Sequence, residues 1–374
     1  MKTTLKKAFS ILSLALLTFS CGSDDDTTTS TNNLTGNTLQ GSITSDLNVP
    51  AGNYFLKGTV HVKSGATLTI QPGTTFTVSA ADQAAGTNYL LVEQGGRLIA
   101  NGTSTMPIIF TSESASIGSW GGLILNGKAR INVTGGTEIA EAGGMVYGGT
   151  NDTDNSGSLK YVRVEYAGAA ITGGTAEYNS FSFFGLGSGT VLENLQAYKG
   201  ADDGFEFFGG TVNATNLAAF GCEDDSIDWD RGYTGTLNNI WVIQPSNGDW
   251  AFETSNHPSE FNNAPRSNPT VTNVTIVGNN NASKAAFLFK EGTAASISNV
   301  VATQVGYGVR VNTQLTEVNN NTLNVTNANF TTLSGNVYNG VDATDISAAV
   351  LTTSTTATGA NAAPFTTGTW LKAW

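Results

Sequence analysis

The sequence predicts an all-β solenoid of short parallel strands, wound in coils of about 22 residues. Only 12% of the 374 residues are charged and 44 are glycine, whereas an ordinary domain has roughly 25% charged residues and about 7% glycine. Thr, Asn, Val and Phe are favoured over the strong helix formers, which is typical of strands and turns. A short apolar–x–Asn–apolar signature also recurs through the second half of the chain.

Composition and charge exclude several classes of protein. A hydrophobic content of 39% provides enough apolar material for a core, so wholesale disorder is excluded. The formal net charge is −12, and no basic block follows the first seven residues. Because nucleic acid and anionic membrane surfaces attract basic patches, we expect neither as a partner surface, and no nucleic acid as a ligand.

The first 20 residues have the pattern of a signal peptide. Three lysines within the first seven residues precede an apolar run over 8–19, which is too short to span a bilayer. The run leads into Leu17-Thr18-Phe19-Ser20-Cys21, which resembles a bacterial lipobox. That resemblance implies lipidation of Cys21 and a membrane attachment through the lipid anchor. The alternative is an ordinary cleaved secretory peptide.

A polar segment separates this leader from the folded domain. Asp24-Asp25-Asp26 follows Cys21 closely and resembles the signal that directs lipoproteins of Bacteroidota to the outer cell surface. We therefore expect an outer-membrane lipoprotein that is exposed at the cell surface, with residues 21–39 as the lipidated cysteine and tether. If Cys21 carries lipid, Cys222 has no disulfide partner and is expected to be a small buried side chain.

Residues 40–374 are expected to form the repeated domain. The first repeated column is an asparagine within an apolar–x–Asn–apolar motif, at Asn194, Asn216, Asn239, Asn273, Asn299 and Asn327. Asparagine tolerates a left-handed backbone and can hydrogen-bond across a turn, so a stacked row of turns is predicted here. The second column alternates apolar residues, at Phe181-x-Phe183, Phe205-x-Phe207, Ile227-x-Trp229, Trp250-x-Phe252, Phe287-x-Phe289 and Val309-x-Val311. Alternation predicts strands with large side chains pointing inward.

Together the two columns resemble those of the right-handed, single-stranded parallel β-helix of the pectate-lyase type. The resemblance covers roughly residues 40–350 and implies internal ladders of stacked side chains. Two segments, 120–127 and 202–210, are also similar to signatures of uncharacterised surface lipoproteins of Bacteroidota. That second resemblance implies a family but no reaction.

The only concentrated chemistry is an acidic strip between residues 202 and 230. It contains eight carboxylates: Asp202, Asp203, Glu206, Glu223, Asp224, Asp225, Asp228 and Asp230. The repeat places Asp202 over Asp224, Asp203 over Asp225 and Glu206 over Asp228, each one coil or about 4.8 Å apart. Like charges this close repel each other unless a cation lies between them.

Three interpretations of the strip remain open. A Ca²⁺ site would use Asp202, Asp203, Asp224 and Asp225, extending to Glu206 and Asp228, because Ca²⁺ prefers six to eight oxygen ligands. A catalytic site would use Glu206 and Asp228 as acid and base on a sugar. The third interpretation is a solvated acidic face whose aspartates cap turns.

The catalytic interpretation lacks several expected parts. Polygalacturonase-like β-helix enzymes carry Gly-His-Gly and Arg-x-Lys elements, and neither is found in this sequence. Lys199 and Arg231 are the basic residues expected beside the acids. Lys290 and Arg310 are expected on neighbouring coils, but neither sits in a recognisable lyase motif.

Two insertions interrupt the period, near residues 134–158 and 253–270. Loops on a rigid solenoid commonly carry function.

The favoured hypothesis is a non-enzymatic cell-surface protein that binds a glycan or a partner or acts in adhesion, with extracellular polysaccharide or a surface protein as its partner. The alternative is an extracellular polysaccharide hydrolase or lyase that uses the stacked carboxylates.

Overall fold

The computed structural model describes residues 33–85, 87–171 and 177–374. The predicted signal peptide, Cys21 and most of the tether lie outside these residues. Within them, no helix is both long enough and apolar enough to cross a membrane. Cys222 is buried, as the sequence predicted.

Strands are the main regular elements in the described part of the chain. The first coils contain β1 (Leu34–Thr35), β2 (Thr38–Ile43), β3 (Leu47–Val49), β4 (Asn53–Val62), β5 (Thr67–Ile70), β6 (Thr75–Val78), β7 (Tyr89–Val92), β8 (Arg97–Asn101) and β9 (Ile108–Ser112). The middle coils contain β10 (Leu123–Asn126), β11 (Thr137–Ile139), β12 (Val146–Gly148), β13 (Gly157–Glu165), β14 (Phe181–Phe184), β15 (Val191–Tyr198), β16 (Phe205–Phe208), β17 (Asn213–Phe220), β18 (Ile227–Asp230) and β19 (Thr236–Ile243). The last coils contain β20 (Phe252–Thr254), β21 (Thr270–Val277), β22 (Ala285–Phe289), β23 (Ala295–Val311), β24 (Leu323–Asn339) and β25 (Leu351–Thr353). Four short helices complete the list: α1 (Ala80–Ala85), α2 (Thr316–Asn319), α3 (Ser347–Val350) and α4 (Ala363–Thr366).

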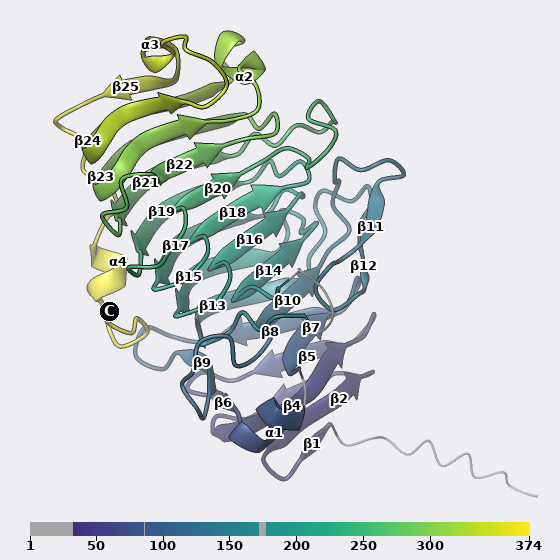
Figure 1. The fold of residues 1–374 in the computed structure, drawn as a ribbon. Helices are drawn as coiled ribbons and strands as arrows, with labels where there is room; N and C mark the ends of the chain where they lie inside the picture. Colours follow the sequence, from purple (N-terminus) through teal and green to yellow (C-terminus); the bar gives the residue numbers. More distant parts are fainter. Residues whose placement is uncertain (1–32, 86, 172–176) are drawn as a thin grey trace, which may run out of the picture. The chain divides into compact units, whose positions relative to one another are not determined.

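Most strands pair in parallel with the equivalent strand of the next coil. β14 pairs with β16, β16 with β18 and β18 with β20, while β15, β17, β19 and β21 form a second continuous series. Figure 1 shows these strands stacked like rungs. Antiparallel strand pairs in the described residues are β1–β2 and the hairpin β11–β12. The predicted parallel β-helix is therefore confirmed.

The asparagine column forms the turns that give each coil its third side. Asn194, Asn216 and Asn239 have φ values of 56°, 59° and 64°, in the left-handed region. Each lies inside a long strand and bends it, so that strand pairing continues on both sides of the asparagine. The side chain of Asn216 donates to Asn194 Oδ1 at 2.9 Å and accepts from Asn239 Nδ2 at 2.6 Å. The coils therefore have three strand segments each.

Stacked aromatic rings fill the interior of the middle coils. Phe181 stacks on Phe205 with ring centroids 4.8 Å apart, and Phe183 lies 5.2 Å from Phe207. All four side chains are fully buried. Because equivalent positions stack directly, burial of this ladder contributes strongly to the stability of these coils.

One position of the inward column differs from the sequence prediction. Ile227 pairs with Phe252, and Trp229 pairs with Thr254, so Phe252-x-Thr254 continues the column and Trp250-x-Phe252 was the wrong alignment. The step from Ile227 to Phe252 is longer than 22 residues because the turn before β20 is longer. Trp250 instead precedes the strand.

Candidate cation site

Three acidic side chains form a row on the outside of adjacent coils. Glu206 and Asp228 each lie between two inward-facing residues of their strand, and so does Glu253 in β20. Glu206 is the register partner of Asp228, and Asp228 is the register partner of Glu253. The strand spacing of about 4.8 Å therefore brings the three carboxylates together on one face.

Two further carboxylates lie in the turns that lead into these strands. Asp203 and Asp225 are 5% and 1% exposed. Asp203 Oδ1 accepts the backbone N–H of Asp225 at 3.0 Å, and Asp225 Oδ1 accepts the backbone N–H of Trp250 at 2.7 Å. Each buried aspartate thus fastens its own turn to the next coil and keeps its second oxygen available for another partner.

The row and the turns converge into overlapping groups of carboxylate oxygens. Oxygens of Asp203, Glu206 and Asp228 lie within 4.8 Å of one another, and the same holds for Asp225, Asp228 and Glu253. Asp228 belongs to both groups. Its Oδ1 atom is buried and has no hydrogen-bond partner among the described residues, which is costly unless another ligand satisfies it.

The outer aspartates form a third group. Asp202, Asp203 and Asp224 also have oxygens within 4.8 Å of one another, while Asp224 is solvent-exposed. Burial, followed by the charge of Asp224, raises the pKa of Asp202 to about 8. The structure therefore brings together three of the four aspartates that the sequence selected as candidate ligands, and it groups the fourth, Asp225, with Asp224 and Asp249.

The two candidate catalytic residues lie at the centre of this site. Burial and the neighbouring Asp228 raise the pKa of Glu206 well above its ordinary range. Burial and the neighbouring Glu253 do the same for the pKa of Asp228. Glu206 Oε2 also accepts a hydrogen bond from Asn179 Nδ2 at 2.5 Å. In the absence of a cation, burial and the neighbouring acids therefore disfavour the charged form of both carboxyl groups.

The cations around the site agree only in part with those that the sequence suggested. Arg231 contacts Asp230 at 2.6 Å, as expected for a residue beside the strip. Lys199, in contrast, lies over the rings of Tyr198 and Trp374. Two lysines that are distant in sequence contact acids at the edge of the site: Lys290 pairs with Glu253 at 2.7 Å, and Lys284 pairs with Asp249.

Both insertions border the acidic face. Within the first, the hairpin β11–β12 packs Tyr147 against Phe184 and is tied to β18 by an ion pair of 2.9 Å between Glu138 and Arg231. The second insertion is joined to the base of the first, because Asn132 Nδ2 donates to the carbonyl and the side-chain oxygen of Asn256 at 2.8 Å each. The two insertions therefore meet next to Arg231.

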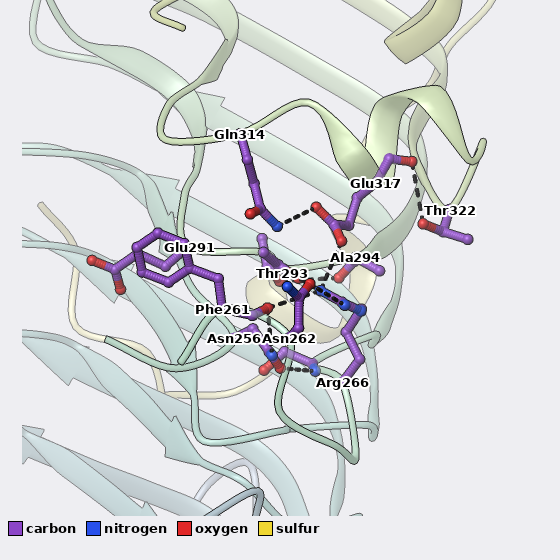
Figure 2. A network of polar contacts seen from close by, with 12 residues as sticks. Asn256, Phe261, Asn262, Arg266, Glu291, Thr293, Ala294, Gln314, Glu317 and Thr322 are labelled. Atoms are coloured by element: carbon purple, nitrogen blue, oxygen red, sulfur yellow. Dashed lines mark hydrogen bonds and ion pairs between the residues drawn. The ribbon is translucent and has the colours of Figure 1, made fainter. Parts of the chain in front are cut away.

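A partly buried ion pair holds the far side of the second insertion. Arg266 pairs with Glu317 at 2.7 Å and donates to the carbonyl of Phe261 at 3.0 Å, and Gln314 Nε2 donates to Glu317 at 2.9 Å. Figure 2 shows these side chains converging from the insertion and from the coil that follows β23. The loop is thereby fixed at both ends, so it forms a firm border to the site.

Sequence reasoning missed Glu253 as a member of the acidic row. The signal was present, because Phe252-Glu253-Thr254 repeats the apolar–acidic pattern of Phe205-Glu206-Phe207 and Ile227-Asp228-Trp229. The misaligned Trp250 concealed it. Lys284 was missed for another reason: nothing in its local sequence indicates a contact with Asp249.

The comparisons with known proteins agree with this architecture. Residues 41–374 match a family model described as a pectate-lyase-like β-helix domain. Neither the search of curated proteins nor the search of solved structures found a match.

Proposed function

Because the chain belongs to the pectate-lyase-like β-helix family, we propose that it uses this scaffold as a non-enzymatic binding protein whose acidic face holds Ca²⁺. Its ligand is an extracellular polysaccharide, and a lipid on Cys21 attaches the protein to the outer surface of the cell. Lipidation and surface exposure rest on the sequence pattern of residues 17–26.

The observation that carries the calcium proposal is the position of Asp228. Its buried, unpartnered Oδ1 atom lies in the row where oxygens from five carboxylates on three coils converge. Oxygen-rich groups of this kind suit a hard cation such as Ca²⁺. A bound cation satisfies Asp228 and offsets the repulsion between Asp203, Glu206 and Glu253.

The pKa of Lys290 favours binding over a lyase reaction, which needs a base. Burial lowers the pKa of Lys290, but the charge and hydrogen bond of Glu253, together with the charges of Asp228 and Glu291, outweigh burial and raise it. A general base at neutral pH requires a lowered lysine pKa instead.

An aromatic and cationic patch beside the acidic row supports the glycan part of the proposal. We define it by Trp250, Lys284, Tyr307, Arg310 and Tyr338. Lys284 Nζ lies 4.3 Å from the centre of the Trp250 ring, and the Arg310 guanidinium lies 4.7 Å from that of Tyr338. Arg310 follows Leu288 and Glu253 in the same outward column. Tyr338 is 38% exposed, and Tyr307 and Arg310 are partly exposed, whereas Trp250 is buried. Accessible aromatic and arginine side chains are typical of binding surfaces.

One observation favours an enzyme as the second candidate. Glu206 has a strongly raised pKa, and a carboxyl group that stays protonated at neutral pH can act as a general acid. In that case the protein would be a polysaccharide hydrolase or lyase, with Asp228 as the second carboxylate.

Calorimetric titration with Ca²⁺ tests the cation site. We expect saturable binding to the protein after EDTA treatment and dialysis, and loss of that binding in Asp228→Asn. The matched control is Asp345→Asn, which removes an exposed carboxylate far along the chain and should leave binding unchanged. No heat of binding in the wild-type protein, together with no calcium-dependent rise in melting temperature, would contradict the calcium site and show that the acidic face is merely solvated.

An array of soluble extracellular polysaccharides, with and without EDTA, separates the two functions. We expect retention of at least one polysaccharide in Ca²⁺, weaker retention in EDTA and no new reducing ends or unsaturated products. Cleavage that is lost in Glu206→Gln would establish the enzymatic alternative.

Fractionation of cells tests the anchor. We expect the wild-type protein in the membrane fraction, accessible to external protease, and Cys21→Ala in the soluble fraction. A soluble wild-type protein whose mature chain begins at another residue would overturn the lipid-anchor proposal.

A further inference from the structure

The segment from Ser354 to Trp374, here called the strap, leaves β25 and runs back along the outside of earlier coils. Figure 1 shows it as the yellow chain that passes from β25 to α4, beside β17 and β15. Near its end the strap reaches the first coils, because Thr369 N donates to the carbonyl of Ser104 at 2.6 Å.

Side-chain amides of separate coils hold the strap backbone. Asn299 Oδ1 accepts the N–H of Thr358 at 2.8 Å. Asn239 Oδ1 accepts the N–H of Asn361 at 2.6 Å, and Asn239 Nδ2 donates to the Asn361 carbonyl at 3.2 Å. Two of the turn asparagines that link coil to coil therefore also bind the strap.

The same reciprocal arrangement recurs further along the strap. Gln196 Oε1 accepts the N–H of Lys372 at 2.7 Å, and Gln196 Nε2 donates to the Lys372 carbonyl at 2.8 Å. Gln196 is fully buried. A buried glutamine that lost these two bonds would leave its polar atoms unsatisfied.

Aromatic side chains fasten the strap to the coil surface. Phe365 and Trp370 are 4% and 0% exposed. The Phe365 ring lies 5.5 Å from that of Trp241, and the Trp370 ring lies 5.9 Å from that of Tyr161. Both belong to a cluster with Phe220 on the outside of the coils, so removal of the strap would expose an apolar groove.

A charged contact completes the attachment. Lys372 Nζ lies 2.8 Å from Glu165, whose side chain is 5% exposed. Arg163 binds the same carboxylate at 2.6 Å and donates to the carbonyl of Trp370 at 2.8 Å. This carboxylate thus lies between one cation of the coil and one of the strap.

We infer that the strap is a latch that joins coils which otherwise contact only their neighbours. In a solenoid, each coil is stabilised by the adjacent coils, so unravelling can begin locally. The strap contacts the coils of Ser104, Glu165, Gln196, Asn239 and Asn299 at once. Local opening between them must therefore either release the strap or stretch it, which slows the unfolding of the whole set.

A nicked protein tests the latch after the fold has formed. A protease recognition sequence is inserted between Thr355 and Thr356, which are exposed in a turn, and the folded protein is cut. We expect the unfolding rate in guanidinium chloride to rise at least tenfold once the freed strap has dissociated. A synthetic peptide of residues 356–374, added in excess, should restore the slow rate.

The matched control carries the same recognition sequence between Ser64 and Gly65, an exposed turn that the strap does not approach; cutting there should change the rate less than twofold. If the cut strap stays bound, Trp370→Ala in the cut protein releases it for the same comparison. An unchanged rate after release overturns the inference, and so does a faster rate that saturating peptide fails to reverse.

Discussion

Each turn asparagine combines a left-handed backbone with an amide that reaches the next coil. In Asn216 the φ value is 59°, and its side chain both donates to Asn194 and accepts from Asn239. The sequence predicted this row because asparagine is one of the few residues that tolerates that backbone. The column was visible because one residue type meets both demands in several successive coils.

Substitution at Asn216 separates the two contributions. We expect Asn216→Ala to lower the free energy of unfolding by about 2–3 kcal/mol, because it adds left-handed strain and removes the amide bonds. Asn216→Gly keeps the backbone relaxed and should cost only about 1 kcal/mol. Denaturant titration of the two variants measures the difference, and equal losses would show that the backbone contributes nothing.

The aromatic ladder gives a second prediction for a single residue. Phe207 is fully buried, between the rings of Phe183 at 5.2 Å and Tyr233 at 4.8 Å. We expect Phe207→Ala to lower the free energy of unfolding by about 3–5 kcal/mol, because the rigid coil cannot close the cavity. Phe55 is 37% exposed, and Phe55→Ala should stay within about 0.5 kcal/mol by the same measurement.

Among the elements, the hairpin β11–β12 depends on one arginine. Arg231 joins Glu138 of the hairpin to Asp230 of β18, and all three side chains are at least partly buried. We expect Arg231→Gln to lower the free energy of unfolding by about 3 kcal/mol, because two carboxylates lose their countercharge.

Limited proteolysis locates that effect. Cleavage should appear between residues 134 and 148 in Arg231→Gln before it appears elsewhere. Lys160→Gln, which removes an exposed ion pair with Glu193, serves as the control and should leave the digestion pattern unchanged. A wild-type pattern for Arg231→Gln would show that the aromatic contacts of Tyr147 hold the hairpin without the ion pair.

The sequence predicted the regular elements well and the contacts of the insertions poorly. The steps from Phe205 to Ile227 and from Asp203 to Asp225 are strictly periodic, so stacking could be predicted from spacing alone. Asn132 and Asn256 are far apart in sequence and belong to no repeat. Their contact depends on how two irregular loops fold, and no local pattern specifies it.

For the whole molecule, the acidic face predicts an unusual dependence of stability on pH. Burial raises the pKa of Asp202 to about 8 and that of Asp230 to about 7, whereas an unfolded aspartate titrates near pH ~4. The folded protein therefore holds more protons than the unfolded chain between these values. This stabilisation is fully present below the unfolded pKa and is lost as the pH rises through 7 and 8.

Thermal unfolding at several pH values tests whether stability falls as the pH rises. In EDTA we expect the melting temperature to fall from pH 5.5 to pH 8.5, because deprotonated acids then repel one another. In Ca²⁺ the fall should be smaller, since the cation replaces the protons. The comparison between the two buffers cancels the contribution to the pH dependence from titrating groups that lie outside the site. Identical slopes in both buffers would contradict a cation at the acidic face.

The fold class of the whole molecule could be predicted from the sequence repeat rather than from local propensity. Because coil follows coil in one register, errors at single positions, such as Trp250, did not alter the predicted architecture. The strap could not be foreseen in this way, since residues 354–374 repeat nothing and take their partners from many coils.

The length of the strap also limits how many coils can lie between its points of attachment. A duplicated coil between Gln196 and Asn239 would move these two residues apart by one further strand spacing, about 4.8 Å. Unwinding α4 from helix to extended chain would release about 7 Å over its four residues. The protein could therefore absorb one extra repeat but not two, which limits how far this solenoid can lengthen by duplication while its latch stays fastened.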